Sequence, residues 1–256
     1  MSFPELHQPQ GPTGTEPVVL LHGGNVANWM WEPQLPALED RLVVTPHLPG
    51  FGNRTSEPWP GLGVVADDIV QRVRELTGRE RFHVVGLSLG GAVALHLAAR
   101  HPDAAISVLA SGVPLLPVTG IPRIATRLHL ALWDKAWFWK AQAAAFRLPA
   151  DSRGPYVDHG LSVRKETARA MLADVHSGRV PDGLSAYAGP LLLVAGEREP
   201  RSVLQSLATA ATAVPRAQIR IAPGMHHVWN IEDPDLFAAM IVAWLDGRVE
   251  PRLRTR

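Results

Sequence analysis

Short aliphatic runs alternate along this chain with longer segments in which apolar residues recur every three or four positions. Runs of this kind are typical of parallel strands that are buried on both faces. They predict strands at 18–21, 41–46, 82–87, 106–110, 191–195 and 218–222. The periodic segments predict helices at 64–76, 89–100, 203–214 and 235–245. This alternation predicts a doubly wound, mostly parallel α/β sheet.

One stretch, residues 114–187, breaks the alternation because it carries helical patterns and no strand pattern. It lies between the fourth and fifth predicted strands. We interpret it as a helical cap inserted over the carboxyl ends of the strands, where open α/β sheets bind ligands. The alternative is an extra helical layer far from any site. The predicted organisation is therefore a core formed by residues 1–113 and 188–256, interrupted by this cap.

The composition excludes several classes of function. The chain has 256 residues, of which 46% are hydrophobic and 19% charged, as in an ordinary globular protein. With 25 basic and 24 acidic residues, it has no net charge that would attract nucleic acid or an anionic membrane. It has no cysteine, so thiolate catalysis, zinc–thiolate sites and disulfides are excluded.

Neither end of the chain carries a recognisable signal. The start, MSFPELHQPQGPTGTEP, lacks a basic segment and an apolar stretch, so no secretory signal is expected. The longest apolar run, VVGLSLGGAVALHLAA, is interrupted by glycines and is too short to cross a bilayer. We therefore expect a soluble, cytoplasmic protein. The arginines near the C-terminus predict a frayed, solvated tail rather than a binding arm. They are Arg248, Arg252, Arg254 and Arg256.

A strand-to-helix turn carries the strongest chemical signal. The segment GLSLGG, residues 86–91, has the form Gly-x-Ser-x-Gly, follows an apolar strand and opens an apolar helix. In that setting Ser88 lies on a sharp, strained turn with its hydroxyl directed out of the sheet. Gly86 and Gly90 relieve the crowding because they lack a Cβ, and Gly91 lets the helix approach the sheet. The helix N-terminus then directs N–H groups toward charge that develops on a substrate.

With three further motifs, the chain resembles the α/β-hydrolase superfamily. LHGG at 21–24, LPGFG at 48–52 and APGMHHVWNIEDPDLF at 222–237 occur in the expected order around GLSLGG. The resemblance covers about residues 17–245 apart from the cap. It implies an α/β-hydrolase fold, catalysis without a cofactor or metal, and a small-molecule substrate. Because little chain precedes LHGG, it implies six strands, or eight with very short leading strands.

The resemblance also assigns roles to single residues. Ser88 is the nucleophile, and the N–H groups of Leu89 and Gly24 form the oxyanion hole. His22 supports the loop after its strand through hydrogen bonds. His47 stands where the family usually has Asp, so the pocket is expected to differ in shape while the chemistry is retained.

The general base is expected after the last long strand, where His226 and His227 both lie. The family spacing places the base five residues before the Glu-x-Pro at 232–234, which selects His227. Two adjacent imidazoles rarely bind one ion, and no carboxylate cluster accompanies them, so no metal site is predicted here.

The third member of the triad is an acid. The family usually carries Asp in a Gly-x-x-Asp segment, and here that segment runs from Gly196 to Glu199, with Glu199 at the acid position. An ionised Glu can orient the imidazole and stabilise the imidazolium. Glu197 and a carboxylate elsewhere are the alternatives, and a helix N-terminal charge is the structural explanation for Glu199.

A serine at such a turn predicts acyl transfer to water. We therefore expect a hydrolase of carboxylic esters or lactones that acts on small, fairly hydrophobic substrates. The alternatives are a C–C bond hydrolase with the same triad and a non-catalytic ligand receptor on the same fold. For each predicted pocket tryptophan, a core position is an equal alternative. The predicted pocket residues are Asn25, Trp133, Trp137, Trp139 and Trp229.

Overall fold

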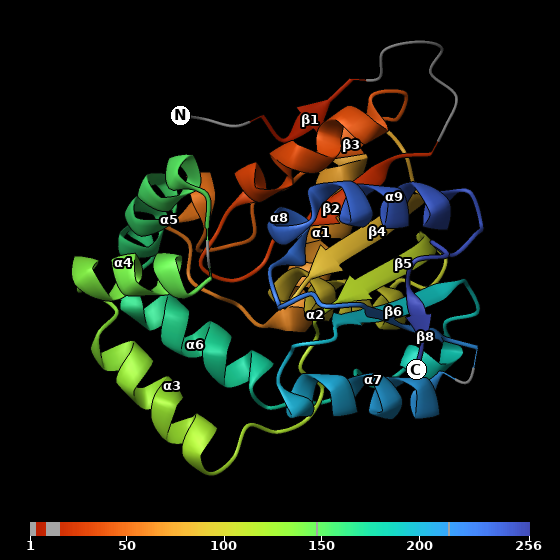
Figure 1. Ribbon diagram of the computed structural model, residues 1–256. Helices are drawn as coiled ribbons and strands as arrows, with labels where there is room; N and C mark the ends of the chain where they lie inside the picture. The colour runs from red at the N-terminus through yellow and green to blue at the C-terminus, as the bar shows by residue number, and fades with distance from the viewer. Residues whose placement is uncertain (1–3, 9–15, 147, 215) are drawn as a thin grey trace.

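The computed structural model describes residues 4–8, 16–146, 148–214 and 216–256, and its centre is an eight-stranded sheet (Figure 1). The strand order is β1-β3-β2-β4-β5-β6-β7-β8. The six inner strands are parallel, and the two edge strands are antiparallel to their neighbours. The strands are β1 (Leu6–His7), β2 (Val18–Leu21), β3 (Val43–Val44), β4 (Phe82–Leu87), β5 (Ala105–Ser111), β6 (Leu191–Gly196), β7 (Gln218–Ala222) and β8 (Arg254–Thr255). The predicted doubly wound, mostly parallel sheet is confirmed.

The edges of the sheet correct two expectations. Among the described residues, one short strand, β1, precedes β2, and the eighth strand is formed by residues 254–255. That strand, β8, pairs with β7, and the Arg254 guanidinium forms an ion pair with Glu197 at 3.1 Å. Residues 254–255 of the tail are therefore paired as an edge strand and are not frayed, while the side chains of Arg248, Arg252 and Arg254 are largely exposed, as expected of a solvated tail. No sequence pattern indicated this pairing, because a strand of two residues is too short to show an alternation of apolar and polar positions.

Helices cover both faces of this sheet. On one face α1 (Leu62–Thr77) packs on α2 (Leu89–Arg100), and on the other α9 (Pro234–Leu245) packs on the 3₁₀ segment η1 (Asn28–Leu38) (Figure 1). The remaining core helices are η2 (Gly52–Arg54), η3 (Leu184–Ala186), α7 (Arg201–Ala213) and α8 (Trp229–Glu232). In the part of the chain that is described, no helix is both long and apolar enough to span a bilayer.

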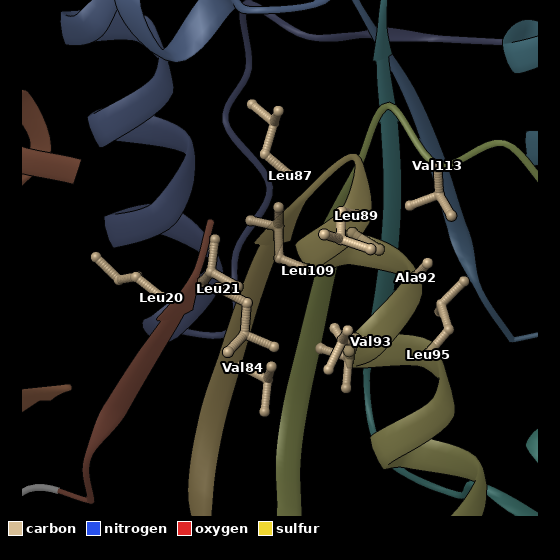
Figure 2. Packing of buried hydrophobic residues seen from close by; sticks show 14 of the residues in the cluster. Leu20, Leu21, Val84, Leu87, Leu89, Ala92, Val93, Leu95, Leu109 and Val113 are labelled. Carbon is tan, nitrogen blue, oxygen red and sulfur yellow. The ribbon is translucent and has the colours of Figure 1, made fainter. Parts of the chain in front are cut away.

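The core is built from the aliphatic strands and the helix that follows β4. Figure 2 shows buried side chains of β2, β4 and β5 together with those of α2. Most residues of α2 are buried, among them Ala92, Val93 and Leu95. A helix that is apolar on all sides belongs in a core. This packing holds the N-terminus of α2 rigidly at the carboxyl edge of the sheet.

Four helices between β5 and β6 lie beside the carboxyl ends of the strands, and we call them the cap helices (Figure 1). They are α3 (Ile121–Ala131), α4 (Ala136–Ala145), α5 (Ala150–Ser162) and α6 (Lys165–Val175). Among the described residues from 114 to 187 there is no strand, as the sequence pattern predicted. The domain boundaries at 113/114 and 187/188 stay a prediction.

Tryptophans form the interior of the cap helices. Trp133 and Trp139 are fully buried, and their rings meet edge to face with centroids 4.7 Å apart. Each indole N–H donates to a carbonyl, that of Trp133 to Val163 at 2.8 Å and that of Trp139 to Trp133 at 2.7 Å. Trp137, in contrast, is 60% exposed. Two of the three tryptophans therefore hold the cap helices together.

Replacing Trp139 and Trp137 in turn tests this arrangement. We expect Trp139→Ala to lower the free energy of unfolding by about 3–5 kcal/mol, because the change leaves a large cavity. Trp137→Ala is the matched control and should change it by no more than about 0.5 kcal/mol, as is usual at exposed positions. Urea unfolding followed by circular dichroism measures both values. Equal losses in the two variants would contradict the described packing.

Candidate active site

The carboxyl ends of β2 and β4 meet at the point where the sheet reverses its winding. The connection after β2 leads to β3 on one side, and the connection after β4 leads to β5 on the other. Open α/β sheets bind ligands at such a point, because the two loops leave a crevice between them. A cavity of about 940 Å³ lies here. The predicted site residues that line it are Gly24, Asn25, Ser88, Leu89, Glu199 and His227.

The turn that carries Ser88 is strained, as the glycine pattern predicts. Ser88 has φ 56° and ψ −112°, a conformation that a residue with a side chain rarely adopts. A Cβ on Gly86 would overlap the backbone of Gly90, and one on Gly90 would overlap the carbonyl of Leu21. The Ser88 N–H donates to the Ser111 carbonyl at 2.8 Å. Close backbone contacts thus hold the strained residue in place.

The predicted acid and base are directly hydrogen-bonded. His227 Nδ1 lies 2.7 Å from Glu199 Oε2, and the Glu199 side chain is fully buried. The other carboxylate oxygen accepts the Gly196 N–H at 3.3 Å. The loops after β6 and β7 are also joined through the backbone, since Arg198 N–H donates to the Met225 carbonyl at 2.9 Å. The two loops therefore place Glu199, which follows β6, beside His227, which follows β7.

This pairing determines the proton affinity of the imidazole. Burial alone lowers the pKa of His227, but the hydrogen bond from its ring to Glu199 and the negative charge there outweigh it and raise the pKa above 6.5. A carboxylate on Nδ1 also favours the tautomer that carries its proton there, which leaves Nε2 as an acceptor. The ring is therefore oriented to take a proton at Nε2.

The competing histidine and glutamate have other partners. His226 Nδ1 lies 2.8 Å from Glu232, whose carboxylate also accepts the His226 backbone N–H at 2.8 Å. Glu197 accepts the Gly224 N–H at 2.7 Å and pairs with Arg254. Both residues thus stabilise the loop that carries His227, whereas the predicted pair of His227 and Glu199 is brought together inside the cavity.

Two residues at the cavity have backbone N–H groups without a partner in the described part of the chain. Gly24 and Leu89 both line the cavity, and neither N–H donates to any residue in the described ranges. Leu89 is the first residue of α2, so its N–H also lies at the positive end of that helix. These positions match the predicted oxyanion hole.

His22 ties the loop after β2 to the loop after β3. It is fully buried, its Nε2 accepts the Leu48 N–H at 3.1 Å, and its Nδ1 donates to the Gly23 carbonyl at 2.8 Å. Burial lowers the pKa of His22 to about 3, so the ring is neutral and can keep one donor and one acceptor. The expected hydrogen-bonded support of this loop is present.

His47, the departure from the family pattern, lies beneath the site and does not line the cavity. Its imidazole occupies the space where a Cβ on Gly52 would otherwise lie, and its backbone N–H donates to Glu5 at 3.0 Å. Burial lowers the pKa of His47. The imidazole therefore fills this loop as an uncharged ring.

The pocket prediction needs correction at its tryptophans. None of Trp133, Trp137, Trp139 and Trp229 lines the cavity, whereas Asn25 does. Trp229 is fully buried and donates from its indole N–H to Ser111 Oγ at 3.0 Å, which supports the strand beside the site. Sequence spacing could not separate pocket from core, because both environments suit a tryptophan.

Several residues of the site have no sequence motif. The cap helix α6 contributes Met171, Leu172 and Val175 to the cavity wall, so the cap helices are not a layer remote from the site. Gly112, with φ +64°, lies directly beneath the acid–base pair: a Cβ there would stand 3.0 Å from both Glu199 Oε1 and His227 Nδ1. Its position two residues after the strand predicted at 106–110 was the available signal.

One cavity brings together the parts of the site. Ser88 on its strained turn, the imidazole of His227 paired with Glu199, and the residues Gly24 and Leu89 all line it. Across the described residues, no group of three or more His, Asp or Glu side chains is arranged to hold a metal ion.

Comparison with known proteins places this arrangement in a family. The model of the alpha/beta hydrolase family matches residues 18–240. The chain belongs to the alpha/beta hydrolase family. A curated relative, the 2-(acetamidomethylene)succinate hydrolase of Mesorhizobium japonicum, is 27% identical, with 91% of this chain and 90% of the relative covered. The protein is accordingly a hydrolase on the α/β-hydrolase fold.

Solved structures share the fold at low sequence identity. An esterase from Exiguobacterium antarcticum is similar with a TM-score of 0.78 and 16% identity, covering 91% of this chain and 92% of the other. The enol-lactonase from Burkholderia xenovorans is similar with a TM-score of 0.75 and 20% identity, covering 94% and 96%. The predicted α/β-hydrolase fold is confirmed by these likenesses together with the family match.

Replacing the acid by its amide tests the role of Glu199. We expect Glu199→Gln to lower kcat by at least about 10²-fold with the fold intact, because an amide favours the wrong imidazole tautomer. Glu197→Gln is the matched control and should lose little, since Gln keeps an acceptor for the Gly224 N–H. Steady-state ester hydrolysis and circular dichroism give the two readouts. A larger loss in the control would move the acid assignment to Glu197.

The pH dependence tests the base. Because His227 must be neutral to accept a proton, kcat/KM should rise with pH through a single step. The raised pKa of His227 places the midpoint above 6.5. His226→Ala should keep this profile and a substantial part of the activity, whereas His227→Ala should lose nearly all of kcat. A wild-type midpoint below 6.5, or equal losses in the two variants, would contradict the assignment.

Proposed function

We propose that this hydrolase is a serine hydrolase that cleaves carboxylic esters or lactones through an acyl-enzyme. The observation that carries the proposal is the meeting of three elements in one cavity. Ser88 lies on a strained turn there, and His227 has its Nδ1 held by the buried Glu199. A serine activated by a base that a third group orients is the arrangement that nucleophilic catalysis requires.

The proposed reaction has two halves. Ser88 Oγ attacks the carbonyl carbon while His227 Nε2 takes the hydroxyl proton, and the carbonyl oxygen becomes an oxyanion between the N–H groups of Gly24 and Leu89. The imidazolium returns the proton to the leaving oxygen, which departs and leaves an acyl group on Ser88. Water then repeats the sequence and releases the acid. Each oxyanion donor supplies about 2.7–4 kcal/mol of transition-state stabilisation in such sites.

The cavity wall supports a small, fairly hydrophobic substrate. Most of its lining residues are aliphatic, aromatic or glycine, and the polar ones are fewer. The apolar lining residues include Val26, Trp29, Met30, Leu148, Met171 and Val175. A volume of about 940 Å³ suits a single small molecule. The names of the esterase and the enol-lactonase with the same fold agree with this substrate class.

A fluorophosphonate probe tests the nucleophile. We expect one adduct, mapped by mass spectrometry to the peptide that holds Ser88, because the probe traps a serine activated by its base. Ser88→Ala should abolish both labelling and turnover of 4-nitrophenyl esters. Ser202→Ala provides the control, since Ser202 also lines the cavity but lies outside the strained turn.

Ester and lactone panels of graded acyl length then define the substrate. Turnover by Ser88→Ala at the wild-type rate, or an adduct on Ser202, would overturn the proposal. Specific labelling of Ser88 without turnover of any ester or lactone would point instead to the C–C hydrolase or the receptor alternative.

A further inference from the structure

A long cationic side chain, that of Arg198, lies at the cavity and takes no part in the acid–base pair. Arg198 is exposed to solvent and lines the cavity, and among the described lining residues there is no other Lys or Arg. Its guanidinium forms no hydrogen bond or ion pair with any described residue, although its backbone N–H is held by the Met225 carbonyl. The five N–H donors of this group are therefore free to bind a ligand that enters the cavity.

The two carboxylates that line the cavity have other partners. Glu199 is bonded to His227, and Glu232 accepts the His226 backbone N–H and lies 2.8 Å from His226 Nδ1. Burial alone would raise the pKa of Glu232, but these hydrogen bonds and the positive charges of His226 and Arg198 lower it. The charge of Arg198 is thus felt beside the base loop, while no carboxylate of the cavity is bonded to it.

We propose that Arg198 binds a carboxylate on the alcohol part of the substrate ester. The inference rests on the proposed ester hydrolysis and adds a substrate class to it: esters whose leaving alcohol carries a carboxylate near the scissile oxygen. A planar guanidinium matches the two oxygens of a carboxylate and can hold both at once. Arg198 is then a specificity-determining residue that binds substrate and takes no part in proton transfer.

The position of Arg198 assigns the carboxylate to the alcohol part and not to the acyl part. Arg198 directly precedes Glu199, and its backbone is bonded to the loop that carries His227. In the proposed reaction the imidazolium of His227 gives its proton to the leaving oxygen, so the alcohol part lies beside this loop. The carbonyl oxygen, in contrast, lies between Gly24 and Leu89.

A general effect of surface charge makes a different prediction. Isolated charges at a protein surface attract any anion weakly, whichever residue carries them. Arg201 is also exposed and lies three residues further along the chain, but it does not line the cavity. Arg201→Gln therefore removes the same charge as Arg198→Gln without removing the proposed contact, and it is the matched control.

The test compares two acetate esters of nearly equal shape. 3-Carboxyphenyl acetate carries a carboxylate on its alcohol part, and 3-carbamoylphenyl acetate has an uncharged amide in its place. The ratio of kcat/KM for the acid to kcat/KM for the amide is measured in each variant. Comparing this ratio between variants cancels the different reactivity of the two esters, and any disturbance of Glu199 would slow both alike.

We expect Arg198→Gln to lower this ratio by about 3- to 10-fold, the size of a charge-assisted contact at an exposed position. The fall should come mainly from a higher KM for the acid, because the contact binds substrate and transition state equally. Arg198→Lys should recover part of the ratio, since it keeps the charge without the planar fork. Added salt should lower the wild-type ratio and leave that of Arg198→Gln nearly unchanged, because salt screens exposed pairs.

Arg201→Gln should keep the wild-type ratio. An unchanged ratio in Arg198→Gln, or an equal fall in Arg201→Gln, overturns the inference while leaving ester hydrolysis intact. Hydrolysis of neither ester, or hydrolysis that Ser88→Ala retains, would instead remove the proposed function, and this inference with it.

Discussion

The structure depends on one close approach of backbones, at the turn between β4 and α2. Gly90 lies so near the end of β2 that any side chain would overlap the Leu21 carbonyl, and a Cβ on Gly91 would overlap the side chain of Val113, beyond β5. The start of α2 therefore packs closely against the ends of β2 and β5, and most residues of this helix are buried. The strain at Ser88 persists because this packing leaves the turn no other conformation. Leu89, the first residue of α2, takes its position at the cavity from this packing.

A second constraint joins the far half of the sheet to this turn. Glu199 and His227 lie 28 residues apart, and their loops are held together mainly by backbone hydrogen bonds and by the carboxylate of Glu197. Because Gly112 has no side chain, the pair can lie against the end of β5. The Ser111 carbonyl there also accepts the Ser88 N–H. The residues Ser111 and Gly112 thus connect nucleophile, base and acid, although neither takes part in the proposed chemistry.

The sequence was informative where local geometry limits the choice of residue. The glycines around Ser88 and the strand cores reflect short-range constraints, and the structure has the same arrangement. The choice of His227 over His226 came instead from the spacing of the family that the chain resembles, and the structure pairs His227 with Glu199. The tryptophans were misplaced because burial in a core and exposure to a pocket depend on helix packing, which periodicity does not record. The strand β8 was missed for a related reason: its pairing depends on the distant strand β7 and not on its own two residues.

The pairing of β8 has a consequence for the edge of the sheet. β8 covers part of the outer edge of β7, and Arg254 bonds to Glu197, which in turn holds the loop before the two histidines. Backbone N–H and C=O groups that are already paired offer no template for strands of other chains. The contacts that fix the histidine loop therefore also protect this part of β7 against edge-to-edge aggregation.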